Sequence, residues 1–153
     1  EVGRYATMFF AILETDGNLE FINAGHPSPI LIRRGNAEAP FTEGSFPVGL
    51  VPDANYVSAR LKLEPEDTLV LFSDGVTEAM DPDEALYGLP RLLETLSGAQ
   101  DAPLEQLQSR ILESVQNFSR GARQADDLTL LLVRYRAAAH AASEASAASS
   151  ASA

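Results

Sequence analysis

The chain has 153 residues, of which 45% are hydrophobic, and this is enough apolar material for one domain with a core. Eleven lysines and arginines against 22 aspartates and glutamates give a formal net charge of −11, and such a surface repels nucleic acid and anionic lipid. The apolar runs are shorter than the roughly 20 residues that span a bilayer, and there is no cysteine for a disulfide framework. These properties favour a cytoplasmic protein without membrane insertion.

The first half of the chain is typical of antiparallel strands joined by turns. Four segments have strand patterns: 5–13, 18–24, 29–33 and 56–63. Asp16-Gly17 separates the first two and favours a tight hairpin turn. The last of the four alternates between apolar and polar side chains, which predicts one buried and one wet face. Residues 38–53 are rich in proline and glycine and are expected to be mostly loop.

The second half of the chain adds helices and two further strands. Residues 68–72 are apolar on both faces and predict a central strand, and 128–135 predict the last strand. Between them, a short helix has the inner stripe Leu89, Leu92, Leu93 and Leu96. A longer helix begins near Asp101 and Pro103 and has an apolar 3.6-residue period over 104–118. Residues 137–153 are almost entirely alanine and serine, so we expect a tail outside the fold.

This order of elements predicts an α+β domain with a mainly antiparallel sheet. One pair of helices can cover only one face of such a sheet. A second layer must therefore come from a second sheet, from another chain, or from residues that this sequence does not contain.

Two acidic motifs adjoin the ends of buried-looking strands. Asp74-Gly75 follows the strand at 68–72, and Asp126-Asp127 precedes the last strand. If the two strands are antiparallel neighbours, these carboxylates gather at one end of the sheet, where like charges require a cation. Oxygen ligands favour Mg²⁺ or Mn²⁺, and Gly75 leaves room for a hydrated ion to approach the backbone. The alternative is that both motifs are ordinary turn residues.

His26 lies in a Gly-His-Pro turn. A histidine in such a turn commonly bonds backbone carbonyls and stabilises the loop. A supporting role as a general acid is the second interpretation, because imidazole titrates near neutral pH.

Five motifs occur in the order and spacing of a known family. They are Tyr5-Ala6-Thr7-Met8-Phe9-Phe10-Ala11-Ile12-Leu13, Asn23-Ala24-Gly25-His26-Pro27, Pro47-Val48-Gly49-Leu50, Phe72-Ser73-Asp74-Gly75-Val76-Thr77-Glu78-Ala79 and Asp126-Asp127-Leu128-Thr129. Through them, the chain resembles the C-terminal part of PPM-type (PP2C-like) serine/threonine phosphatases, in the bacterial SpoIIE/RsbU-like branch. We assign residues 1–136 to this domain and 137–153 to the tail.

The resemblance implies a PP2C-like β-sandwich of antiparallel sheets flanked by helices, with the N-terminal part missing. It also implies a binuclear Mn²⁺ or Mg²⁺ site, with Asp74 and Asp126 as ligands and Asp127 as a weaker candidate. The family bridges both metals with an aspartate of an upstream Gly-Asp motif, and no such motif is present here. We therefore expect the chain to supply part of the site and to have little activity alone.

By the same resemblance, a metal-activated water would dephosphorylate phosphoserine or phosphothreonine on a protein. The expected substrate is an anti-sigma-factor antagonist or a similar signalling partner, and a sensor or receiver domain is expected upstream. Two alternatives remain open. One is a non-catalytic phosphatase-like module that binds a protein, and the other is a domain whose acidic edge holds a structural Ca²⁺, although a regular calcium loop is absent.

Overall fold

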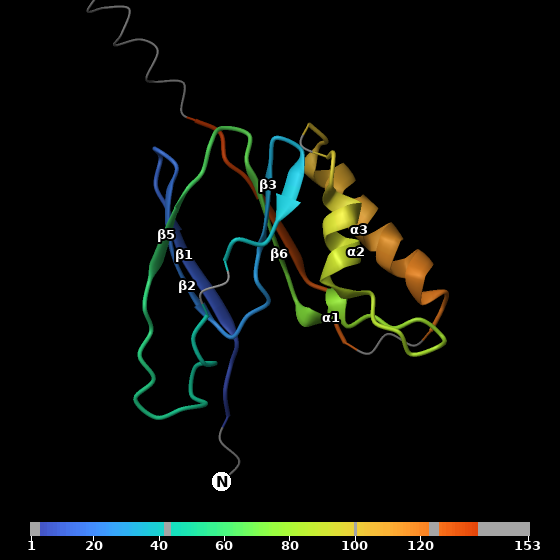
Figure 1. Cartoon of the computed structure of the whole chain (residues 1–153), viewed down its shortest axis with the longest axis horizontal. Helices are drawn as coiled ribbons and strands as arrows, with labels where there is room; N and C mark the ends of the chain where they lie inside the picture. The colour runs from blue at the N-terminus through green and yellow to red at the C-terminus, as the bar shows by residue number, and fades with distance from the viewer. Residues whose placement is uncertain (1–3, 42–43, 100, 123–125, 138–153) are drawn as a thin grey trace, which may run out of the picture.

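The computed structural model describes residues 4–41, 44–99, 101–122 and 126–137. In these segments two antiparallel sheets lie side by side, with helices beside one of them (Figure 1). The elements in chain order are β1 (Met8–Leu13), β2 (Asn18–Ala24), β3 (Ile30–Arg33), β4 (Asn36–Glu38), β5 (Ala59–Lys62), β6 (Thr68–Phe72), α1 (Asp74–Thr77), α2 (Gly88–Leu96), α3 (Leu104–Ser119) and β7 (Leu130–Arg134). No helix in the described segments combines the length and the hydrophobicity needed to cross a membrane.

The first sheet has the strand order β1-β2-β5. β1 and β2 form the expected hairpin and pair along the whole of β1. Gly17 in the connecting turn has a φ of +91°, and a Cβ there would lie 2.6 Å from the carbonyl oxygen of Leu63. The turn therefore requires glycine for its backbone conformation and for its close packing against the end of β5.

The second sheet has the strand order β4-β3-β6-β7. β6 is a central strand, as its two apolar faces predict, and it pairs antiparallel with β3 on one side and β7 on the other. Because β3 and β7 both run opposite to β6, the start of each lies at the sheet end where β6 stops. Figure 1 shows α1 at this end, in the lower part of the view.

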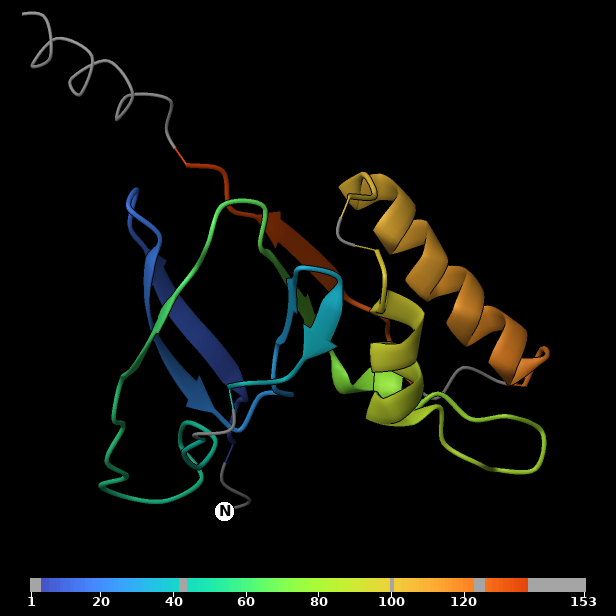
Figure 2. The ribbon, with the colours of Figure 1, turned by 45° about the horizontal axis from the view of Figure 1, so that its top comes forward.

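Each face of the second sheet packs against a different layer. α2 and α3 cover one face, and the first sheet faces the other (Figure 2). The buried core on the helical side comprises Ile30, Ile32, Val70, Phe72, Val76, Tyr87, Leu92, Leu96, Ala99, Leu107, Ile111 and Val115. The core between the sheets comprises Leu19, Phe21, Leu31, Phe41, Leu63, Leu69 and Tyr135. The missing second layer is therefore a second sheet built from this chain.

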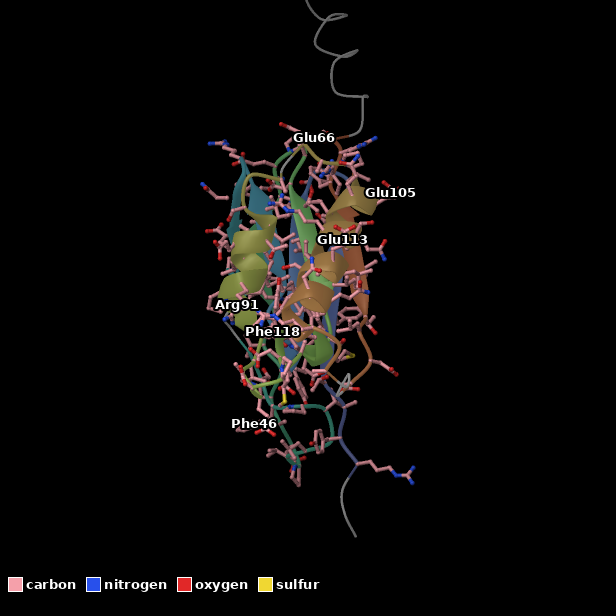
Figure 3. The ribbon with its side chains drawn as sticks, turned by 90° about the vertical axis from the view of Figure 1, so that its right-hand side faces the viewer. Phe46, Glu66, Arg91, Glu105, Glu113 and Phe118 are labelled. Atoms are coloured by element: carbon pink, nitrogen blue, oxygen red, sulfur yellow. The ribbon has the colours of Figure 1, made fainter. Side chains whose placement is uncertain are left out.

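The two long helices follow the predicted apolar stripes. Leu92 and Leu96 of α2 and Leu107, Ile111 and Val115 of α3 are buried. At the outer surface the guanidinium carbon of Arg91 lies 4.6 Å from the ring centroid of Phe118, and Figure 3 shows these two side chains next to each other. This cation–π contact joins α2 to the C-terminal part of α3.

Several element boundaries differ from the sequence prediction. β5 begins at Ala59 rather than at residue 56, and Val57, expected on the buried face, is 68% exposed. β1 begins at Met8, because upstream of it Ala6 forms only an isolated bridge to Val48. The short strand β4 and the helix α1 were not predicted. Of the expected tail, only Ala137 lies among the described residues.

The sandwich has apolar surfaces that nothing in the described segments covers. Met8, Phe10 and Ile12 on the outer face of β1 are 43%, 51% and 55% exposed. Leu131 of β7 pairs with Leu71 on the side that faces the first sheet, yet it is 55% exposed. Such apolar surfaces are expected of part of a larger domain. The fold is α+β, with two antiparallel sheets, helices on one face and a partly open sandwich.

Candidate metal centre

Asp74 is the first residue of α1, immediately after β6 and Ser73. One oxygen of its carboxylate, Oδ1, accepts a hydrogen bond from the backbone N–H of Gly75 at 3.0 Å. Its backbone carbonyl accepts a second bond from the N–H of Glu78 at 2.8 Å. Val76 is fully buried in the helical core and anchors the short helix. The carboxylate of Asp74 is thereby placed on a fixed turn at the exposed end of the sheet.

Asp126 and Asp127 lie before the start of β7, and both are exposed. Oδ1 of Asp126 accepts a hydrogen bond from the N–H of Asp127 at 2.8 Å. β6 and β7 are antiparallel neighbours, and their last regular pair joins Phe72 to Leu130. This pairing confirms the predicted geometry of the two strands. It brings both acidic motifs to one end of the second sheet.

Gly75 lies directly against the backbone of the acidic pair. A Cβ at this position would lie 2.6 Å from the carbonyl oxygen of Asp127 and 3.4 Å from that of Asp126. No side chain fits at the shorter distance without a backbone shift. The expected reason for glycine here was the approach of a hydrated ion. The contact that the structure provides is between the two acidic segments themselves.

Ser73 joins the same two segments through hydrogen bonds. Its N–H donates to the carbonyl of Thr129 at 3.1 Å, and its hydroxyl donates to the carbonyl of Asp127 at 2.9 Å. The N–H of Thr129 donates to the Ser73 hydroxyl at 3.0 Å. Ser73 and Thr129 lie in the family motifs, but neither was predicted to have a role in the site. The signal for them was present, since each is the hydroxyl residue between an acidic motif and a strand.

His26 occupies a loop at the same end of the second sheet, because this loop leads into β3. Asn23 closes the loop from both sides: its Oδ1 accepts the N–H of His26 at 2.9 Å, and its Nδ2 donates to the carbonyl of His26 at 3.0 Å. The Nδ1 of His26 lies 2.9 Å from the carbonyl oxygen of Pro27. These contacts correspond to the loop-stabilising interpretation of this histidine. None of them joins it to Asp74.

The three aspartates offer carboxylate oxygens at an exposed edge, which is the donor chemistry that Mg²⁺ and Mn²⁺ prefer. Within the described segments there is no group of three or more His, Cys, Asp or Glu side chains that could hold a metal ion. The assignment of Asp74, Asp126 and Asp127 as ligands therefore stays a prediction.

Comparison with known proteins gives the family. Residues 1–136 match the family of Stage II sporulation protein E (SpoIIE). The chain belongs to the SpoIIE family. This membership confirms the SpoIIE/RsbU-like branch that the sequence motifs indicated.

Two relatives of similar sequence are much longer than this chain. Protein IcfG from Synechocystis sp. is 31% identical over 134 residues, which are 87% of this chain and 21% of that protein. Phosphoserine phosphatase RsbP from Bacillus subtilis is 29% identical over 136 residues, which are 87% of this chain and 32% of that protein. The chain thus spans no more than a third of the length of these two relatives.

Two solved structures have the same fold as this chain. The RsbU and RsbW domains of Rv1364c from Mycobacterium tuberculosis match 86% of this chain with a TM-score of 0.66 and 26% identity, over 36% of that chain. The phosphatase domain of SpoIIE from Bacillus subtilis matches 85% of this chain with a TM-score of 0.64 and 18% identity, over 56% of that chain. The fold is therefore PP2C-like, and the chain forms only part of the domain.

Proposed function

We propose that the protein carrying this chain is a metal-dependent phosphatase that hydrolyses phosphoserine or phosphothreonine on a protein. The observation that carries the proposal is the pairing of β6 with β7 in a SpoIIE-family fold, which sets Asp74-Gly75 against Asp126-Asp127. The relative RsbP is named a phosphoserine phosphatase, and this supports phosphoserine as the group that is hydrolysed.

The residues at the sheet end fit a hard divalent cation. Asp74 and Asp126 would hold Mn²⁺ or Mg²⁺ through carboxylate oxygens, and Asp127 is the third candidate ligand. When bound, such ions lower the pKa of water and offset negative charge that develops on phosphoryl oxygens. The remaining ligands, including the family's Gly-Asp aspartate, would come from outside this chain. A structure of the SpoIIE phosphatase domain is described as presoaked with Mn, which supports the choice of metal.

The chain's own contribution to the reaction is to hold its carboxylates in place. α1 fixes the backbone of Asp74, and the hydrogen bonds of Ser73 hold the segment before β7. His26 would support the site through the contact of its ring with the carbonyl of Pro27, in a loop before β3 that the side chain of Asn23 holds closed. We further propose an anti-sigma-factor antagonist or a similar signalling protein as the substrate, and an upstream sensor or receiver domain as the regulator.

The alternative is a phosphatase-like module that binds a protein without turnover. It is favoured by the lack, among the described residues, of a complete group of metal-binding side chains. The two functions differ in whether phosphate is released, so one assay separates them.

The test is phosphate release from a protein phosphorylated on serine by the intact protein, with Mn²⁺ or with EDTA. We expect turnover only with the metal, and a loss of at least about 100-fold in Asp74→Asn, since even residues that support metal ligands cost 10–100-fold when replaced. Glu113→Gln is the matched control, because Glu113 is an exposed carboxylate on α3 and belongs to neither acidic motif (Figure 3). Normal turnover in Asp74→Asn would refute the ligand assignment, and no turnover in the unmodified protein would favour the binding module.

A further inference from the structure

The chain leaves the β6–β7 ladder at Ser73, and this creates a local problem of hydrogen bonding. In a regular antiparallel pair, residues that exchange bonds donate and accept with each other in both directions. The N–H of Ser73 makes its half of the exchange with the carbonyl of Thr129. The carbonyl of Ser73 has instead turned into α1, where it accepts the N–H of Val76 at 3.1 Å. The N–H of Thr129 therefore loses its ladder acceptor.

The side chain of Ser73 replaces the lost acceptor. Its hydroxyl oxygen lies 3.0 Å from the N–H of Thr129 and accepts that bond. The same hydroxyl donates its proton to the carbonyl of Asp127 at 2.9 Å. One side chain thus binds the backbone on both sides of Leu128 and extends the connection between β6 and β7 beyond the last regular pair, Phe72 with Leu130.

We infer that the hydroxyl of Ser73 is a positioning group, which sets the separation between the carboxylate of Asp74 and those of Asp126 and Asp127. This inference rests on the proposed function, because the separation matters only if the carboxylates share metal ions. Asp74 is the next residue after Ser73, and Asp127 accepts its hydroxyl proton, so both acidic segments are held by one residue. Without the hydroxyl, the backbone bond from Ser73 to Thr129 and the close approach of Gly75 to Asp127 remain, but the bond from Ser73 to the carbonyl of Asp127 is lost.

The position requires a group that donates and accepts at the same time. A serine or threonine hydroxyl has one donor and two lone pairs and meets this requirement. The side chains of alanine and valine can neither donate nor accept a hydrogen bond. Ser73→Thr should therefore preserve the positioning, and Ser73→Ala should remove it. The carbonyl of Asp127 and the N–H of Thr129 both belong to exposed residues, so water can replace the Ser73 hydroxyl as their hydrogen-bond partner in Ser73→Ala. Such a water would not restore the connection between β6 and the segment before β7.

The experiment measures Mn²⁺ binding to the intact protein by calorimetric titration and the exchange rate of the Thr129 amide by NMR or mass spectrometry. For Ser73→Ala we expect the half-saturating Mn²⁺ concentration to rise at least about tenfold, the typical effect of losing a group that orients metal ligands. The Thr129 amide should also exchange faster. Ser73→Thr should stay within about threefold of the unmodified protein. Ser97→Ala is the matched control, since its exposed hydroxyl donates to a helix carbonyl of Leu93, and it should leave Mn²⁺ binding unchanged.

The possible outcomes separate this inference from the proposed function. Unchanged Mn²⁺ affinity in Ser73→Ala, with faster exchange at Thr129, overturns the inference and leaves the phosphatase proposal intact. A rise in half-saturating Mn²⁺ that Ser73→Thr fails to reverse also overturns it, because the hydroxyl would then not be the cause. If the unmodified protein binds no Mn²⁺, the proposed function fails and the positioning role fails with it.

Discussion

Gly75→Ala tests how closely the two acidic segments must approach each other. The added Cβ would lie 2.6 Å from the carbonyl oxygen of Asp127, whereas close carbon–oxygen contacts are about 3.3 Å. The backbone of one segment must therefore move by about 0.7 Å. Because Asp74 begins α1 and the carbonyl of Asp127 is hydrogen-bonded to Ser73, this shift changes the separation of Asp74 from Asp126 and Asp127.

The cost of this shift can be estimated for stability and for activity. Inserting a methyl group into a close-packed contact destabilises a protein by about 1–3 kcal/mol. A misplacement of about 1 Å in catalytic geometry costs about 100-fold in rate, so a loss of tens-fold is expected here. Phosphate release at saturating Mn²⁺ measures the rate, and urea denaturation measures the stability.

Gly44→Ala is the control for this substitution. A Cβ at Gly44 meets its nearest neighbour, the carbonyl oxygen of Asn23, at 4.0 Å, and its φ is not in the left-handed region. It should leave both activity and stability near those of the unmodified protein. If Gly75→Ala also leaves activity and stability unchanged, the two acidic segments do not need the close approach that the structure gives. That result would refute the role assigned to Gly75.

Two further predictions concern stability. Asp67 is 2% exposed and pairs with Arg33 at 2.6 Å. Asp67→Ala should therefore destabilise the fold by about 2–3 kcal/mol, which is less than for a fully buried pair because Arg33 is 26% exposed. An unchanged midpoint of urea denaturation would contradict this. The hydrogen bond from Ser58 lowers the pKa of Glu20 from its ordinary value of 4.5. The ionised carboxylate therefore favours the folded state above that value, and this stabilisation is lost as pH falls through the lowered pKa. Ser58→Ala should reduce the melting temperature at about pH 7 and leave it unchanged at about pH 2, and an equal loss at both values would contradict the assignment.

The strands were predictable where the sequence pattern and the pairing coincide. Residues 18–24 and 68–72 were predicted with the bounds that the structure has. The hairpin turn at Asp16-Gly17 shows where the first of these strands begins, and apolar residues on both faces identify the second. β5 was predicted too long. Alternation continues to residue 56, but the pairing with β2 ends where Phe21 meets Ala59, and an alternating pattern carries no information about where the partner strand ends.

The site was predictable in its position and not in its detail. Each acidic motif adjoins a strand with a buried pattern, and the assumption that these two strands are antiparallel neighbours predicted that Asp74 lies near Asp126 and Asp127. The pairing of β6 with β7 confirms the arrangement of the strands. α1 was missed because Asp-Gly favours a turn and four residues are too few to show a helical period. The role of Ser73 follows from α1, since its hydroxyl acts where the backbone carbonyl has turned into the helix. The metal ligands themselves remain predictions.

The central claim is that the paired ends of β6 and β7 provide part of a binuclear metal site. The most direct measurement is anomalous diffraction at the manganese edge from crystals of the intact protein grown with Mn²⁺. We expect a manganese peak within about 2.1 Å of carboxylate oxygens of both Asp74 and Asp126, the distance typical of a small hard cation. A peak elsewhere, or none in an intact protein that is folded and saturated with Mn²⁺, would contradict it.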